Sequence, residues 1–166
     1  KKENIVMFFI KNSKNEWWEL DKETMTVFNF NGGSHNITKQ DLESSEILEC
    51  DGWHELYKIK KWSPLEVSVK WTDVWVSPDG LFYDGDAHEN RAEEILEIMY
   101  GEVGVNWTGD RLEELGWIRA TTSLMWEIRA DSDYWNNKLI SQKQYDALWD
   151  WCKCHNKKFP QNIELN

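Results

Sequence analysis

The chain has 166 residues, the size of one ordinary domain or of two very small ones. Hydrophobic residues make up 40% of it and charged residues 30%, a balance that is typical of a globular domain and excludes a disordered tail. The formal net charge of −11 disfavours direct binding of nucleic acid, whose affinity comes largely from lysine and arginine, and favours a partner with a basic surface.

The first thirty residues predict a β-meander. Three segments rich in apolar, aromatic and β-branched residues are separated by polar turns: Ile5–Ile10, Trp17–Leu20 and Thr24–Phe30. A short helix is expected next, because Thr38 can cap a helix in which Asp41 suits the positive end of the helix dipole. We expect this helix to end by Ser45.

The following segment predicts a hairpin. Ile47–Cys50 and Glu55–Lys60 are expected as its two strands, joined across Asp51-Gly52. This dipeptide is favoured in type I′ turns, where both central residues need positive φ.

A second hairpin is expected after a strand at Glu66–Trp71, where apolar and polar residues alternate. Its strands, Val74–Val76 and Leu81–Tyr83, flank Ser77-Pro78-Asp79-Gly80. Proline pre-sets φ at the second position of this turn, and glycine accepts the left-handed position that closes it.

A long helix is predicted from Asp86, whose side chain can cap it, with Glu89 returning the capping bond. Apolar residues then recur at helical spacing before Gly101 ends the helix, beginning at His88 and continuing at Ala92, Ile95, Leu96 and Met99. Arg111–Leu115 predicts one short helical turn, stopped by Gly116.

The last part of the chain predicts two paired strands, Trp117–Ala120 and Leu124–Ile128, and a C-terminal helix. Ser141 and Gln144 make a capping box for this helix, and Pro160 lies beyond its end. Its apolar stripe is expected at Tyr145, Leu148, Trp149 and Cys152.

These elements predict an α+β fold, with an antiparallel sheet built from hairpins and two main helices packed on one face. A single domain over residues 1–166 is the simplest organisation, and two sub-lobes, 1–62 and 63–166, are the alternative. No apolar run is long enough to span a bilayer, so no membrane partner is expected. Three cysteines are too few for a disulfide framework, which favours a reducing, cytoplasmic compartment.

Two clusters could be interpreted as metal sites. Cys152-x-Cys154-His155 resembles part of a zinc site, but the two thiols point to different sides of a helix, so structural cysteines are favoured. Asp84, Asp86, His88 and Glu89 could hold a divalent cation or supply a hydrolase, but helix capping accounts for the same residues. We therefore expect no metal and no cofactor, and assign no catalytic residue.

The chain contains 12 tryptophans, more than a core of this size needs. Adjacent residues of a strand face opposite sides, so one of Trp17 and Trp18 leaves the core unless both faces of the sheet are covered. Trp149 and Trp151 lie about 200° apart on a helix. We expect Trp18 and Trp151 to face outward as anchors for a partner.

The acidic excess is concentrated between Asp84 and Glu114. This stretch holds ten acids against Arg91 and Arg111, so its net charge is 2 − 10 = −8. On the predicted helix, carboxylates repeat at every fourth residue, about 6 Å apart, and repel one another. The acidic residues expected to meet a basic partner are Glu89, Glu93, Glu97, Glu113 and Glu114. A solvated helix face is the alternative.

The segment Trp75-Val-Ser-Pro-Asp-Gly-Leu-Phe-Tyr83, then His88 and Ala92, then Leu112-Glu-Glu-Leu-Gly-Trp-Ile118 resembles a module of small proteins from bacteriophages and mobile elements. It covers about 45 of the 166 residues. The resemblance implies a bacterial cytoplasmic setting and a phage or prophage origin, and it provides no catalytic residue to carry over. Small acidic proteins of this origin are often inhibitors of host machinery, including anti-CRISPR and other anti-defence proteins.

Three functional hypotheses follow. The leading one is a non-enzymatic inhibitor that presents its acidic surface to the basic channel of a host nucleic-acid-processing enzyme. The second is a small metal-dependent hydrolase or nuclease that uses Asp84, Asp86, His88 and Glu89. The third is an aromatic pocket that sequesters a nucleotide, which the lack of a basic cluster near the aromatic residues disfavours.

Overall fold

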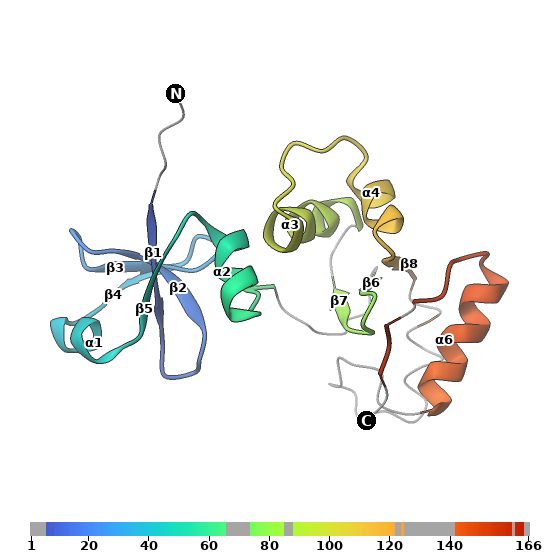
Figure 1. Ribbon diagram of the computed structural model, residues 1–166, viewed down its shortest axis with the longest axis horizontal. Coiled ribbons are helices and arrows are strands. Elements are labelled where there is room, and N and C mark those ends of the chain that lie inside the picture. Colours follow the sequence, from blue (N-terminus) through green and yellow to red (C-terminus); the bar gives the residue numbers. More distant parts are fainter. Residues whose placement is uncertain are drawn as a thin grey trace. The chain divides into compact units, whose positions relative to one another are not determined.

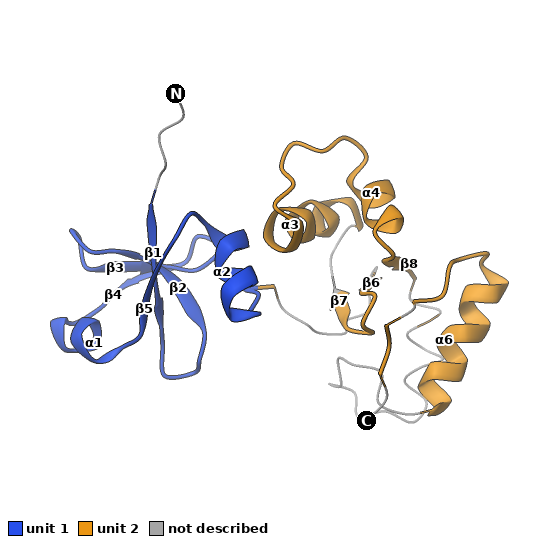
Figure 2. Ribbon diagram, viewed as in Figure 1, with its two compact units in different colours: residues 1–64 blue, residues 65–166 orange. Residues whose placement is uncertain are grey.

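The computed structural model describes residues 6–65, 74–84, 88–121, 124, 142–160 and 162–164. They fall into two compact units, 1–64 and 65–166 (Figure 2). Helices and antiparallel sheets are both present, which confirms the α+β class. Within the described residues, no helix has the length and apolarity needed to cross a membrane. A single domain over the whole chain stays a prediction.

Unit 1 is built on a five-stranded antiparallel sheet (Figure 1). Its strand order is β4-β3-β2-β1-β5, which confirms the meander of the first thirty residues. The strands are β1 (Met7–Lys11), β2 (Trp17–Asp21), β3 (Thr26–Phe28), β4 (Ser34–Asn36) and β5 (Ile47–Cys50), and the helices are α1 (Lys39–Ser44) and α2 (Trp53–Lys60).

Both faces of this sheet are covered. On one face Phe9 and Trp17 pack with Leu56 of α2. On the other face Ile10 and its neighbours pack against Leu42 of α1. Successive residues of β1 therefore enter different apolar clusters, as the alternation of side chains along a strand requires.

Helix α1 begins as predicted. The Asp41 amide donates to the Thr38 hydroxyl at 3.0 Å, and the Thr38 amide donates to the Asp41 carboxylate at 3.3 Å. The two residues therefore form a capping box, which satisfies two backbone donors that the first turn of the helix would leave unpaired. The helix ends at Ser44, within the predicted limit.

The predicted strand at Glu55–Lys60 is wrong, because Trp53–Lys60 forms helix α2. Gly52 precedes this helix in extended backbone, with φ 164°, instead of closing a hairpin turn. Trp53 and Leu56, three residues apart, pack into the same apolar cluster, as residues on one face of a helix do, whereas residues of a strand at this spacing face opposite sides. Ile59 is 52% exposed and contributes little to this face.

Unit 2 contains a three-stranded antiparallel sheet of order β7-β6-β8 and longer helices. The strands are β6 (Val74–Val76), β7 (Phe82–Asp84) and β8 (Ile118–Ala120), and the helices are α3 (His88–Tyr100), α4 (Thr108–Glu114) and α6 (Gln142–Cys154). The predicted hairpin turn is confirmed, with the Gly80 amide donating to the Ser77 carbonyl at 2.9 Å and Gly80 at φ 91°.

Central strand β6 is buried on both sides. Val74 and Val76 pack with Leu148 and Trp151 of α6. On the other side the Trp75 indole donates to the His88 carbonyl of α3 at 2.7 Å. Helices α3 and α6 therefore cover opposite faces of this sheet, rather than the same face.

The buried face of α6 differs from the predicted stripe at two of four positions, because Gln144 and Trp151 are buried in place of Tyr145 and Trp149. Trp151 is 3% exposed and lies in the core, whereas Trp149 is 44% exposed. The expectation that Trp151 faces outward is therefore wrong. The buried residues of α6 are Gln144, Leu148, Trp151 and Cys152, which recur at helical spacing.

Several predictions fall outside the described residues: the strand at Glu66–Trp71, the capping residues Asp86 and Ser141, and residues 125–128 of the last predicted strand. The short helix expected at Arg111–Leu115 is present and begins earlier, at Thr108. Strand β4 is an addition to the prediction.

Candidate functional site

The predicted partner-binding acids lie on α3 and α4, and the first of them, Glu89, is exposed but is bound by its neighbours in unit 2. Its carboxylate accepts from the Gly109 amide at 2.9 Å and from the Thr108 hydroxyl at 2.8 Å, and Arg119 donates to it at 3.2 Å. The hydrogen bond from the Gly109 backbone amide is the main reason that the pKa of Glu89 lies below its ordinary value. Trp107 precedes α4 without a side-chain cap, so Glu89 supplies the cap from a distant part of the chain.

Gly109 permits this arrangement by having no side chain. A Cβ atom at this position would collide with the Arg119 guanidinium and would lie 2.5 Å from the Glu89 carboxylate. The helix start, the carboxylate and the guanidinium therefore occupy one tightly packed cluster.

Arg119 is shared among three carboxylates. Besides Glu89, it forms ion pairs with Asp110 at 3.5 Å and with Glu113 at 3.3 Å. Its guanidinium also lies 5.3 Å from the ring centre of Trp75. Glu113 is further paired with Lys157 at 3.1 Å. Both Glu89 and Glu113 are therefore partly neutralised within the fold.

A second cluster forms around Arg111. Its guanidinium donates twice to the Glu102 carboxylate, at 2.9 Å each, and once to Glu114 at 3.1 Å. These bonds lower the pKa of Glu102 and raise that of Arg111. The charge of Glu114 is thus also balanced by a neighbour.

Glu93 and Glu97 are different, because both are exposed and neither has a hydrogen bond or ion pair within the described part of the chain. They lie four residues apart on α3, about 6 Å from each other along one edge of the helix. Most of the described acids of the Asp84–Glu114 stretch are therefore paired, and the two described acids without a partner lie on α3.

A loop joins α3 to α4 (Figure 1). It carries two exposed apolar side chains. Val103 is 78% exposed and Trp107 is 79% exposed. Trp107 adopts left-handed backbone at φ 57°, a conformation that bulky residues rarely take. Gly101 and Gly104, at φ 68° and 72°, shape the rest of the loop. We call residues 101–107 the α3–α4 loop.

Of the two tryptophans predicted as anchors, Trp151 cannot meet a partner because it is buried, and the role of Trp18 stays a prediction. Trp18 is half-buried on the face of the unit 1 sheet that α1 covers. Trp107 was missed because it belongs to no periodic element. The sequence does contain an indication of its exposure. Trp107 follows two closely spaced glycines, Gly101 and Gly104, in a segment that forms no helix or strand with a buried face.

The residues of the proposed hydrolase are partly engaged in the fold. The His88 ring nitrogen Nε2 lies 2.7 Å from the Ala120 carbonyl and 3.2 Å from the Val74 carbonyl, between β8 and β6. Glu89 caps α4 as described. Asp86 and the side chain of Asp84 lie outside the described residues. Among those that are described, no three side chains of metal-binding type come together.

The C-terminal cysteines face different sides of α6. Cys152 is buried, and burial raises the pKa of its thiol to about 11, whereas Cys154 is exposed. The His155 ring stacks on Trp151 at a centroid distance of 4.1 Å. This packing supports the interpretation of Cys152 as a structural cysteine.

Comparison of the chain with protein families, with curated proteins and with solved structures gives no match in any of the three.

Proposed function

We propose that this protein is a binding module that docks a partner with a basic surface on the α3–α4 loop and the adjoining face of α3. The observation that carries this proposal is the exposure of Trp107, 79%, on a backbone in the left-handed region. A tryptophan gains nothing for stability by lying in water. Tryptophan is the residue type most enriched among those that contribute most to protein–protein binding.

The loop is held firmly at its base, which favours binding. Glu102, at its start, accepts two hydrogen bonds from the Arg111 guanidinium, and the backbone amide of Arg111 donates to the Trp107 carbonyl at 3.0 Å. Glu89 fixes the first turn of α4. A loop that is already ordered loses little conformational entropy when it binds a partner.

The unpaired charges lie beside this loop. Glu97 is located one turn before the end of α3 at Tyr100, and Glu93 one turn further back. Their charges would attract a basic partner and speed its encounter, and salt would weaken this attraction. Trp107 would supply most of the affinity and the carboxylates most of the charge selectivity.

In its specific form, the proposal is that of a phage-type inhibitor that covers a basic surface of a host nucleic-acid-processing enzyme. Support comes from the net charge of −11 and from the resemblance of residues 75–118 to a module of phage proteins. The hydrolase alternative is not favoured, since His88 and Glu89 are engaged in packing and capping.

The test is capture of a bacterial protein from lysate at low and at high salt, its identification by mass spectrometry, and reconstitution of the complex from purified components. We expect a basic nucleic-acid enzyme that binds at low salt and whose activity falls in the complex. Trp107→Ala should weaken binding at least tenfold, as expected for a central aromatic anchor. The double variant Glu93→Gln/Glu97→Gln should reduce the salt dependence.

Trp149→Ala is the matched control, because Trp149 is also an exposed tryptophan of unit 2 but lies on α6. It should bind as the wild type does. Equal binding by Trp107→Ala and the wild type would show that the partner uses another surface, and failure to capture any protein at either salt concentration would refute the proposal.

A further inference from the structure

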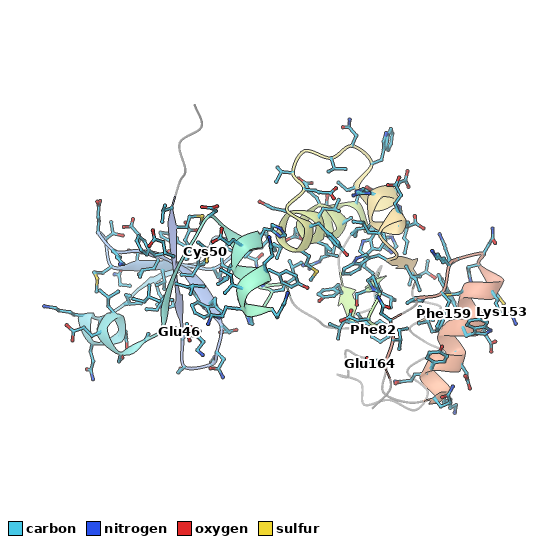
Figure 3. The ribbon with its side chains drawn as sticks, viewed as in Figure 1. Glu46, Cys50, Phe82, Lys153, Phe159 and Glu164 are labelled. Atoms are coloured by element: carbon cyan, nitrogen blue, oxygen red, sulfur yellow. The ribbon has the colours of Figure 1, made fainter. Side chains whose placement is uncertain are left out.

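Unit 1 contains a cavity of about 490 Å³ that the proposed function does not use. Its apolar wall comes from strands β1 and β3 and the residue after β4: Ile10, Val27 and Ile37. The C-terminal end of α1 and the residue before β5 close another side with Ser44, Ser45 and Glu46; Glu46 is labelled in Figure 3. Its volume lies within the range of about 300–1,000 Å³ that is usual for small-molecule sites.

Two aromatic side chains line this cavity. The rings of Trp18 and His35 meet edge to face, with their centroids 4.8 Å apart. Trp18 is half-buried, so part of its ring remains accessible. Such a pair offers a planar ligand both a stacking surface and ring N–H groups.

Several polar groups of the cavity have no protein partner. In the part of the chain that is described, no hydrogen bond is formed by the Trp18 indole N–H, by the ring nitrogens of His35 or by the side-chain hydroxyls of Ser44 and Ser45. Side-chain donors and acceptors in a partly enclosed site are usually satisfied by the fold, by water or by a ligand. These groups therefore remain available to hydrogen-bond a bound molecule.

Each charged residue of the lining already has a partner in the fold. Lys11, the one lysine among the lining residues, forms an ion pair with Glu46 at 3.5 Å. Glu46 is also held by Lys60 at 2.6 Å. The remaining charged residue of the lining, Asp41, accepts the Thr38 amide of the capping box. The lining thus has two carboxylates and one paired lysine, which is unfavourable for a phosphate group.

We propose that this cavity binds an uncharged, planar, nitrogen-containing aromatic compound of the class of a nucleoside without phosphate. The ring would stack on Trp18 and meet the His35 ring at a steep angle, because the planes of these two side chains differ by 66°, and its polar edges would bind the serine hydroxyls. The sequence disfavours a nucleotide because it has no basic cluster near its aromatic residues, and the structure extends this argument: the phosphate is disfavoured, but the base is not.

The experiment is a titration of the ¹⁵N-labelled full chain with adenosine, followed by NMR of the indole N–H signals of its tryptophans. Trp18→Phe assigns the signal of Trp18. We expect adenosine to shift this signal in a saturable manner and to leave that of Trp107 unmoved. Adenosine monophosphate should bind at least tenfold more weakly than adenosine, because its phosphate meets the carboxylates of the lining.

His35→Ala tests the site itself. His35 is exposed, so the variant should fold, and the loss of one of the two aromatic contacts should weaken adenosine binding about tenfold. Ser34→Ala is the matched control: it is exposed on the same strand, faces the opposite side and does not line the cavity, so its affinity should be unchanged.

Three results would overturn the inference: no shift of the Trp18 signal at millimolar adenosine, equal affinity for adenosine and adenosine monophosphate, or unchanged affinity in His35→Ala. The inference is independent of the proposed function. Trp107→Ala should bind adenosine as the wild type does, and His35→Ala should capture the same protein partner, so failure of one proposal is distinguishable from failure of the other.

Discussion

The carboxylate of Glu89 gives the most direct test of how unit 2 is stabilised. Glu89→Gln keeps the size of the side chain and one acceptor oxygen, but it removes the charge that receives the Gly109 amide, the Thr108 hydroxyl and Arg119. We therefore expect the variant to fold and to be less stable at neutral pH.

The magnitude follows from what is lost. A hydrogen bond to a charged group contributes about 1.5–3 kcal/mol and a neutral one about 0.5–1.5 kcal/mol, so the change in charge removes roughly 1 kcal/mol. The ion pair with Arg119 adds little, because the Glu89 side chain is 54% exposed and Arg119 keeps two other carboxylates. A loss of about 1 kcal/mol should lower the Tm by roughly 2–4 °C if the chain unfolds as a whole, or 4–8 °C if unit 2 unfolds alone.

The effect should depend on pH. The pKa of Glu89 is lowered in the folded state from its ordinary value of 4.5, so its charge stabilises the fold above pH 4.5 and this contribution disappears as the pH falls through the folded-state pKa. Urea unfolding of the variant and of the wild type at pH 7 and at acidic pH measures the free energy of unfolding under each condition. The difference between Glu89→Gln and the wild type should shrink on acidification.

Glu93→Gln is the control for this experiment. Glu93 lies one turn further along α3, is exposed and has no partner among the described residues. The free energy of unfolding of this variant should therefore differ from that of the wild type by no more than a few tenths of a kcal/mol. Equal stability of Glu89→Gln and the wild type at pH 7, or a difference that persists undiminished at acidic pH, would refute the capping role.

Three further predictions concern packing. Trp151→Ala should cost about 3–5 kcal/mol in thermal or urea unfolding, because it opens a cavity in the core, whereas Trp149→Ala should cost less than about 1 kcal/mol. Cys154 should be the one thiol that reacts with a disulfide reagent in the folded protein, since the other two are buried with raised thiol pKa values; mass spectrometry of the labelled chain locates it. Gly109→Ala should be destabilising, measured by the urea midpoint, although alanine favours helix by about 1 kcal/mol, because the added methyl group displaces Arg119; a more stable variant would contradict the close packing.

The elements that could be predicted from the sequence are those decided by neighbouring residues. The capping box at Thr38 and the turn at Ser77–Gly80 each need four consecutive residues, and both occur as expected. Long helices α3 and α6 also follow from their apolar periodicity. In these cases local chemistry and tertiary packing favour the same structure.

Where the prediction was wrong, the local sequence was compatible with two different structures. Asp51-Gly52 has the composition of a hairpin turn, but Gly52 is extended and starts α2. The packing of Leu56 against the sheet of unit 1 favours the helix, and this contact cannot be predicted from the residues adjacent to Leu56 in sequence. Similarly, Trp149 and Trp151 compete for the inner face of α6, and packing against β6 selects Trp151.

The candidate site was harder to predict, because charge can be counted from the sequence but pairing cannot. Arg119 reaches Glu89 across 30 residues, and Lys157 reaches Glu113 across 44. Together with the local pair of Glu114 and Arg111, they leave Glu93 and Glu97, of the five predicted acids, without a partner among the residues that the structure describes. Trp107 was not predicted because an exposed loop residue follows no periodic pattern of burial.

Strand β4 has a consequence for how the protein behaves at high concentration. It closes one edge of the unit 1 sheet with only three residues, Ser34–Asn36, all of them exposed and polar. A neighbouring molecule that added a strand there would gain few backbone hydrogen bonds and no apolar contact from those side chains. Its brevity and polarity therefore make this edge a poor template for aggregation, and they protect the sheet from growing into an intermolecular assembly.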